Sequence, residues 1–264
     1  MADPYLALLA AQVRGQLQYR VSFVLDVASQ LAVATLDLSA VLVLFRVTPA
    51  LGGFAVGEVV LMVGLSGTAF AAADLAVGSV ERLRLYVRTG LFDTVLIRPL
   101  GALAQLVALD FQLRRIGRLL AAAAVLAVGA AWPGVDWTGA RVALAVLAVL
   151  GGAAFFSALF VAGATVAFWW IESGEVANAF TYGGRDFTSY PVTIYQGWFR
   201  RLFAFGLGFG FVAYYPSLAV LGRPDPLGAP AWVAWTAPLV AVPAMVAAGL
   251  VWRTGVRHYR STGS

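Results

Sequence analysis

The chain has 264 residues, of which 61% are hydrophobic and only 12% are charged, whereas soluble domains carry about 25% charged residues. No soluble core of this length could bury so much apolar surface, so the composition indicates a membrane protein. The net charge is +5, but the charges lie in short runs between apolar stretches. This pattern favours membrane-flanking arginines over a nucleic-acid surface.

The residue types exclude several kinds of catalytic site. Cysteine is absent, and the single histidine, His258, lies in a polar stretch near the C-terminus, so thiolate chemistry and histidine-based metal sites are not expected. No G-x-x-x-x-G-K-[ST] phosphate loop occurs, and all 18 cationic residues are arginine. We therefore expect no cofactor, metal or nucleotide site in this chain.

The first twenty residues, 1–20, predict an amphipathic helix on the membrane surface. Polar residues separate apolar side chains that recur at helical spacing, at Leu6, Leu9, Val13 and Leu17. The apolar run there is short and no basic stretch precedes it, so we do not expect a cleavable signal peptide.

Six later stretches are long enough to cross a bilayer, which takes about 20 apolar residues. They are Val21–Phe45, Phe54–Gly78, Leu113–Trp132, Ala140–Trp170, Leu202–Leu221 and Ala231–Trp252. At the start of the third span, Arg114, Arg115 and Arg118 are expected to reach back to the headgroups. The fourth span would measure about 46 Å as one helix, so we expect it to be tilted, broken near Gly151–Gly152, or projecting from the bilayer.

The arginines predict the orientation. With the N-terminus inside, fifteen arginines lie on the cytoplasmic side, and only Arg46, Arg141 and Arg223 lie outside. We therefore predict an all-α, polytopic transmembrane protein of the cytoplasmic membrane, with about six spans and both termini in the cytoplasm. A tail over residues 253–264 would follow the last span.

The moderately polar segment Ile171–Tyr195 has two interpretations. In the preferred one it is a cytoplasmic or interfacial connection. In the other it crosses the membrane, sheltered by partner helices, and Phe203–Leu221 re-enters from outside. Arg200 and Arg201 would then also lie outside, and the arginines would divide thirteen against five.

Two blocks carry a family resemblance. The segment Arg88–Leu100 reads RTGLFDTVLIRPL; by itself it predicts a juxtamembrane amphipathic helix. It resembles the cytoplasmic coupling region of type-2 ABC transporter (ABC-2) permeases, in which a Gly, a hydrophobic residue, an acidic residue and a Pro-Leu pair lie between the second and third spans. The block Tyr190–Gly222 resembles a six-span bacterial subfamily of about 260 residues, through Tyr190, Pro191, Arg200, Arg201, Tyr214, Tyr215 and Pro216.

The resemblance implies a single permease domain over 1–264, without enzymatic activity, in a bacterial exporter. ATP and Mg would be held by a separate cytoplasmic ABC ATPase dimer, and a second permease chain, homologous or identical, would complete the complex. The coupling region would be residues 79–112, with apolar anchors for a groove and charges for orientation. Its candidate contacts are Glu81, Arg84, Arg88, Leu91, Phe92, Asp93, Arg98 and Pro99.

A pathway lined mainly by Val, Ala, Leu and Phe suits a hydrophobic or amphipathic substrate, such as a drug, an antibiotic or a lipid-like molecule. Two other functions stay open. A small secondary transporter or channel would show inverted repeats, which this sequence lacks. A membrane-embedded enzyme could use the carboxylates Asp37 and Asp74, although no motif supports it.

Charged residues within the predicted spans are candidates for an export pathway or a subunit interface. Asp37 is near the middle of its span, where an ionised carboxylate is costly unless it is paired or hydrated. Asp37 and Asp74 could serve the pathway, or Asp37 could be held by an internal hydroxyl partner. Asp26 and Glu58 lie nearer the span ends, where interfacial solvation is expected. Spacing predicts a structural ion pair between Asp110 and Arg114.

The predicted fifth span has two further features. Gly206 and Gly210 form a G-x-x-x-G pattern, which allows close helix contact and could serve the contact with a second permease chain. Tyr214 and Tyr215 would lie near its external end. They could form part of an outer gate, or an aromatic belt in front of a helix-ending Pro216.

Overall fold

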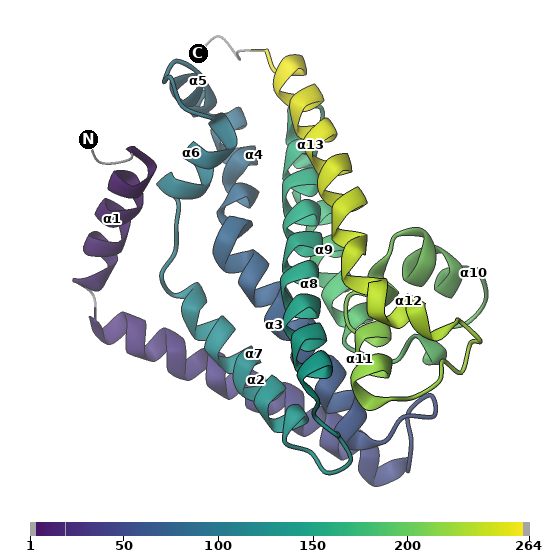
Figure 1. The fold of residues 1–264 in the computed structure, drawn as a ribbon. Helices are drawn as coiled ribbons and strands as arrows, with labels where there is room; N and C mark the ends of the chain where they lie inside the picture. The colour runs from purple at the N-terminus through teal and green to yellow at the C-terminus, as the bar shows by residue number, and fades with distance from the viewer. Residues whose placement is uncertain (1–3, 19, 261–264) are drawn as a thin grey trace.

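The computed structural model describes residues 4–18 and 20–260, which form an elongated helical bundle (Figure 1). The predictions over residues 1–3, 19 and 261–264 lie outside the described residues. The principal helices are α1 (Pro4–Leu17), α2 (Arg20–Val47), α3 (Val56–Val77), α4 (Leu83–Arg88), α5 (Leu91–Leu96), α6 (Ala102–Leu109), α7 (Arg115–Ala130), α8 (Gly139–Thr165), α9 (Gly174–Thr188), α10 (Gly197–Arg200), α11 (Tyr214–Leu221), α12 (Ala231–Thr236) and α13 (Ala241–His258). Within the described residues, the one β-feature is an isolated bridge between Leu51 and Phe54.

The bundle has two ends, which we name by residues that lie there. The Arg82 end carries α4, α5 and α6 together with the last turns of α13 (Figure 1). The Gly52 end carries the turn between α2 and α3. Helix α1 is tied to the Arg82 end, because the Gln16 side chain donates to the Phe111 carbonyl at 2.6 Å and accepts from the Leu113 amide at 2.7 Å.

Helices α3, α7 and α8 form the centre of the bundle. Helix α3 is buried along most of its length, and glycines allow α7 to approach it closely. A Cβ added at Gly64 would lie 2.4 Å from the Leu126 Cα, and one added at Gly129 would lie 2.7 Å from the Leu61 Cα. Helix α2, in contrast, leaves most of its side chains exposed and runs obliquely past α7 (Figure 1).

Helix α8 continues through Gly151–Gly152, so the break predicted as one possibility there is absent. These glycines serve close packing instead. A Cβ at Gly151 would lie 2.7 Å from the Pro238 carbonyl oxygen in the segment between α12 and α13. Helix α13 itself continues past the predicted limit at Trp252 to His258.

Helix α9 connects the two ends of the bundle. At its start, a Cβ on Gly174 would lie 2.2 Å from Nη1 of Arg84, at the Arg82 end. Just after it, the Thr193 hydroxyl donates to the Gly52 carbonyl at 2.7 Å, at the opposite end. The preferred interpretation of 171–195, as a connection on one side of the membrane, is therefore wrong. The contacts match the alternative, in which this segment crosses.

The predicted fifth span, Leu202–Leu221, is a re-entrant hairpin rather than one helix. A short π-helical stretch, Arg201–Gly206, follows α10, and the chain then reverses at Gly208, whose φ is 86°. The helical stretches before and after this break are bent by 61° relative to one another. Both arms lead back to the Gly52 end, because Thr193, before the first arm, contacts Gly52, and Arg223, which follows α11, donates to the Gly53 carbonyl at 3.1 Å.

The chain is an all-α, polytopic membrane protein. Among the described residues, four stretches are long and apolar enough to cross a membrane: Val21–Val47, Val56–Arg88, Gly139–Phe168 and Ala231–His258. The bent pair would make a fifth if it were one span. Helices α7 and α9 are shorter and are not among these candidates, yet each joins the two ends of the bundle. Six spans stay a prediction, in which α9 would replace Leu202–Leu221. Arg200 and Arg201 consequently join the Gly52 end, as in the alternative arginine count.

Candidate functional site

The segment between α3 and α6 folds into a helical hairpin, which we call the α4–α5 hairpin (Gly78–Leu100). Gly90, with φ of 73°, makes the reversal between the two helices, a conformation that glycine adopts without strain. Leu83, Val87, Phe92 and Val95 point inward and pack with Leu106 and Phe168 in a small core of their own. The hairpin is therefore a pre-formed unit rather than a loose loop.

The predicted coupling residues divide into buried and exposed groups. Phe92 has no exposed surface, and its ring lies 5.1 Å from that of Phe168 and 4.9 Å from that of Tyr259, measured between centroids. The prediction that Phe92 contacts a partner directly is therefore wrong, because it holds the hairpin together. The exposed tip is formed by Leu91, Leu96, Ile97, Arg98 and Pro99, and Ile97 is 82% exposed.

Asp93 faces the C-terminal helix end instead of the tip. Its carboxylate interacts with the Tyr259 hydroxyl; burial and this carboxylate raise the pKa of Tyr259 to about 12. Tyr259 also packs on Phe168, with ring centroids 5.8 Å apart. Asp93 thus belongs to the contact between α5 and the residues after α13.

A buried carboxylate organises the region behind the hairpin. Asp74, at the end of α3, is 2% exposed and accepts from Arg115 Nη1 at 2.6 Å and from Arg118 Nη1 at 2.7 Å. Arg115 also donates to the Asp74 carbonyl at 2.6 Å. The prediction that Arg115 and Arg118 reach toward headgroups is therefore wrong: they turn inward, because a buried carboxylate needs paired donors.

Gly78 leaves the space that this ion pair occupies. A Cβ at Gly78 would lie 1.8 Å from Arg115 Nη1 and 2.2 Å from Asp74 Oδ1. Any larger residue would have to displace the guanidinium. The end of α3, the start of α7 and the base of the hairpin are thus fixed together by Gly78, Asp74 and Arg115.

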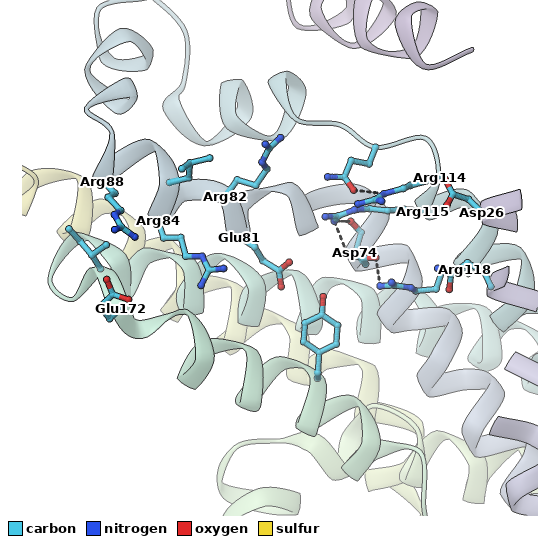
Figure 2. A pocket seen from close by; sticks show the side chains of 15 residues that line it. Asp26, Asp74, Glu81, Arg82, Arg84, Arg88, Arg114, Arg115, Arg118 and Glu172 are labelled. Atoms are coloured by element: carbon cyan, nitrogen blue, oxygen red, sulfur yellow. Dashed lines mark hydrogen bonds and ion pairs between the residues drawn. The ribbon is translucent and has the colours of Figure 1, made fainter. Parts of the chain in front are cut away.

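Around these residues lies a cavity of about 930 Å³ at the Arg82 end, which we call the arginine pocket. Figure 2 shows its side chains converging from α2, α3, the hairpin, α7 and the segment before α9. Six arginines and four carboxylates line it, together with uncharged side chains. The lining residues are Asp26, Gln30, Asp74, Glu81, Arg82, Arg84, Leu85, Arg88, Gln112, Arg114, Arg115, Arg118, Ile171, Glu172 and Tyr182.

Three of the predicted coupling residues, Glu81, Arg84 and Arg88, line this pocket rather than the tip (Figure 2). Glu81 lies near the Tyr182 side chain of α9, and both line the pocket. Arg84 lies over the start of α9, where its Nη1 is 3.9 Å from Glu175 Oε1, an exposed pair that adds little stability. The base of the hairpin therefore touches α9 as well as α7.

Asp110 pairs with Arg82 and not with Arg114 as predicted. The i, i+4 rule requires a helix, but α6 ends at Leu109 and α7 begins at Arg115. Arg114 donates instead to the Gln112 side chain at 3.0 Å. The observed pair fastens the hairpin base to the end of α6.

Asp37, near the middle of α2, is paired with an arginine rather than a hydroxyl group. Its Oδ2 lies 3.6 Å from Arg185 Nη2 of α9, and the side chains are 54% and 37% exposed. Arg185 also lies over the Phe70 ring at 5.7 Å. This pair borders a second cavity of about 180 Å³ between α2, α3, α7 and α9, which we call the apolar pocket because Val, Ala, Leu and Phe form most of its wall.

The remaining pathway candidates lie in the re-entrant hairpin and the helix after it. Gly206 and Gly210 stand on opposite sides of the reversal, so the prediction of a G-x-x-x-G face on one helix is wrong. Tyr214 and Tyr215 are almost fully buried at the start of α11, and Pro216 lies in its first turn, so it does not end the helix as predicted.

The two tyrosines hold the loop after α11. The Tyr214 hydroxyl donates to Asp225 Oδ1 at 2.6 Å, and the Tyr215 hydroxyl is 3.5 Å from Oδ2. Asp225 also accepts from the backbone amides of Leu227 and Ala229, both at 3.1 Å. Because Tyr214 and Tyr215 are buried, they are better interpreted as a structural cap at the Gly52 end than as an aromatic belt.

A second ion pair stands at the same end. Arg223 pairs with Glu58 Oε2 at 2.5 Å, and its guanidinium lies over the Phe54 ring at 4.6 Å. Glu58 is thus paired within the protein, where interfacial solvation had been predicted. The sequence analysis did not predict that Arg115, Arg118 and Arg185 form ion pairs with carboxylates inside the protein, because it assigned arginines to the membrane surface.

Among the described residues, no group of three or more His, Asp or Glu side chains converges in a way that could hold a metal ion. A family model described as "ABC-2 family transporter protein" matches residues 31–263. Comparison with curated proteins and with solved structures gives no match. The match extends over most of the chain and confirms the resemblance drawn from its two motif blocks. The chain belongs to the ABC-2 transporter family, as a multi-pass membrane permease.

Proposed function

We propose that this chain is the permease subunit of a bacterial ABC exporter, driven by a separate ATPase dimer. The Arg82 end then faces the cytoplasm, which places most arginines there. The sequence supports a division of labour, because it contains no phosphate loop and no lysine to complete one. A second permease chain, identical or related, completes the transport pathway.

The single observation that carries this proposal is the exposed apolar tip on a firmly packed hairpin. Leu91, Leu96 and Ile97 project from the Arg82 end although apolar positions beside them are buried. Exposed apolar residues with an adjacent charge, here Arg98, are typical of a protein-binding surface. The proposed partner is the ATPase.

The route for movement is also short. The candidate span Val56–Arg88 joins α3, a 3₁₀ turn and α4 without a loop. A displacement at the tip would therefore pass along α4 into α3, and through the Asp74 pairs into α7. Because packed helices move as rigid units, closure of two ATPase subunits would shift these helices relative to one another.

The proposed substrate is a hydrophobic or amphipathic molecule that leaves through the membrane-spanning part. The apolar pocket offers such a surface, and residues of α2 form one of its walls. The rest of α2 is packed along little of its length, so its apolar side chains are exposed beside the pocket. The proposed second permease chain, instead of a substrate, could also pack against the exposed face of α2.

The experiment purifies the tagged chain from membranes of its source organism and measures the phosphate-loop ATPase that remains bound to it. A Leu91→Asp/Ile97→Asp double variant should lose at least about tenfold of the bound ATPase, because two charges would enter an apolar contact. The matched control is Trp198→Asp, which puts a charge on a side chain that is 72% exposed at the opposite end. Equal ATPase recovery with the double variant and the wild type would refute the proposal.

A further inference from the structure

The ion pair between Asp37 of α2 and Arg185 of α9 is incomplete within one chain. Asp37 Oδ2 and Arg185 Nη2 are 3.6 Å apart, and the two side chains are 54% and 37% exposed. Among the described residues, neither side chain forms a hydrogen bond or a second ion pair. The pair therefore keeps carboxylate and guanidinium atoms that can bind a further partner.

The position of this pair makes its exposure costly. Asp37 lies well inside the candidate span Val21–Val47, and only 6% of the apolar part of that span is buried in the single chain. Charged side chains within a membrane face other helices or water, because hydrocarbon offers them neither donors nor acceptors. A polar surface is therefore expected to cover Asp37 and Arg185 in the assembled protein.

Helix α13 shows that exposed apolar side chains alone do not indicate such a cover. Val242, Val246 and Leu250 are about as exposed as the apolar residues of α2. Lipid covers apolar side chains as well as another helix does, so it is a sufficient neighbour for them. The stretch of α13 from Ala241 to Trp252 contains no charged residue, and the ion pair is what distinguishes the α2 face.

A second copy of this chain would supply the missing partners. Two copies with the same orientation in the membrane are related by an axis normal to it, so residues at equal depth meet. In such a two-fold contact the same patch of both copies is buried, and the patch must be complementary to itself. A carboxylate beside a guanidinium group meets this condition, because Asp37 of each copy would face Arg185 of the other. The four side chains would form a ring of alternating charge.

We propose that the surface of α2 and α9 around Asp37 and Arg185 binds a second copy of this chain, which we call the α2–α9 interface. This inference rests on the proposed function, which requires a second permease chain, and deepens it by identifying that chain as an identical copy. The tests below use this chain without the ATPase. Their failure would therefore leave the ATPase-binding experiment unaffected, and the reverse also holds.

Cysteine cross-linking tests whether the interface forms in membranes. The chain has no native cysteine. Val33→Cys, one helical turn before Asp37, replaces a side chain that is 52% exposed, and a short bismaleimide should join two copies through it. The matched control is Val246→Cys on α13, where the wild-type side chain is 58% exposed and no cross-linked dimer is expected.

Exchange of charges between copies tests the ring itself. Asp37→Arg and Arg185→Asp each place two like charges at the pair within one chain. In a mixed dimer, the introduced arginine of one copy would face the introduced aspartate of the other. When the two variants carry different tags and are co-expressed, recovery of the mixed dimer should exceed that of either variant with itself at least about tenfold.

Two further variants are the controls for this exchange. Asp37→Arg/Arg185→Asp keeps one charge of each sign in every chain, so it should dimerise as the wild type does and shows that the fold tolerates the reversal. The same exchange at the other ion pair uses Glu58→Arg in one copy and Arg223→Glu in the other. That pair is already hydrogen-bonded within the chain, so the mixed dimer should not be favoured there.

Two results would overturn the proposal. One is the absence of a cross-linked dimer through position 33, or equal cross-linking through positions 33 and 246, because lipid would then cover both faces alike. The other is equal recovery of mixed and unmixed dimers of the Asp37 and Arg185 variants, which would show that the two pairs do not meet across a contact.

Discussion

The hydroxyl of Thr193 donates a hydrogen bond of 2.7 Å to the carbonyl oxygen of Gly52, a residue 141 positions earlier in the chain. Gly52 lies in the turn between α2 and α3, and Thr193 follows α9. This contact places the far end of α9 beside that turn, so the chain passes from one end of the bundle to the other between Gly174 and Thr193. In the predicted six-span arrangement, the fifth pass would therefore be the polar helix α9 and not Leu202–Leu221.

Residues on the two sides of α9 should be labelled from opposite sides of the membrane. The chain has no cysteine, so single substitutions need no prior removal of native thiols. In the proposed orientation, Trp198→Cys should react with a membrane-impermeant maleimide in intact cells, whereas Glu172→Cys should react only after lysis. Labelling of both positions from the same side would contradict the crossing.

Replacing Gly78 by alanine should destabilise the protein by about 3 kcal/mol. The new Cβ would collide with Arg115 and separate it from Asp74, which leaves a buried charge without one of its two partners. Thermal unfolding in detergent, followed by the tryptophan fluorescence, measures the loss.

The matched control for Gly78 is Gly183→Ala in α9, where an added Cβ meets no atom within 4 Å. Alanine is favoured over glycine in a helix by up to about 1 kcal/mol, so this variant should be as stable as the wild type or slightly more so. Similar losses in the two variants would mean that the Asp74–Arg115 pair does not constrain position 78.

Phe92 and Ile97 should separate stability from partner binding. Phe92→Ala removes a fully buried ring and should cost about 3–5 kcal/mol of stability. Ile97→Ala changes a side chain that is 82% exposed and should alter stability by less than about 0.5 kcal/mol, yet weaken ATPase binding. Unfolding curves and co-purification are measured on the same preparations, and a stable Phe92→Ala variant would count against the hairpin core.

Apolar length predicted α2, α3, α8 and the stretch of α12 and α13, because each is long enough to cross a bilayer. It failed for α9, whose polar side chains include Glu175, Asn178 and Arg185. Arg185 is tolerated there because Asp37 of α2 pairs with it, and a partner so distant in sequence leaves no local signal. The second interpretation of this segment in the sequence analysis, in which neighbouring helices shelter it, is the one that agrees with the contacts.

The re-entrant hairpin was missed for the opposite reason. Leu202–Leu221 is apolar throughout and long enough to span, so hydropathy predicts a crossing. The reversal depends on Gly208, which takes a left-handed φ of 86° beside Phe155 and Val240. The segment contains several glycines, so the sequence does not indicate that the chain reverses at this one. The family motifs, in contrast, singled out the segment that folds as the α4–α5 hairpin, although not which of its side chains are buried.

The two tyrosines at the start of α11 should differ in their contribution to stability. Tyr214→Phe removes a 2.6 Å hydrogen bond to the Asp225 carboxylate and should cost about 1.5–3 kcal/mol. Tyr215→Phe removes a 3.5 Å contact with the same carboxylate and should cost clearly less. Thermal unfolding of the paired variants tests this order, and a larger loss for Tyr215→Phe would reverse the assignment of the main partner.

Site-specific cross-linking tests most directly whether work enters through the α4–α5 hairpin. A photoreactive maleimide is attached to Ile97→Cys or, as a control, to Val47→Cys. Val47 is 86% exposed and lies near the Gly52 end. In membranes that contain the partner ATPase, illumination should join the Ile97 position, and not the Val47 position, to the ATPase. Cross-linking from position 47 alone, or labelling of position 97 from outside intact cells, would contradict the account.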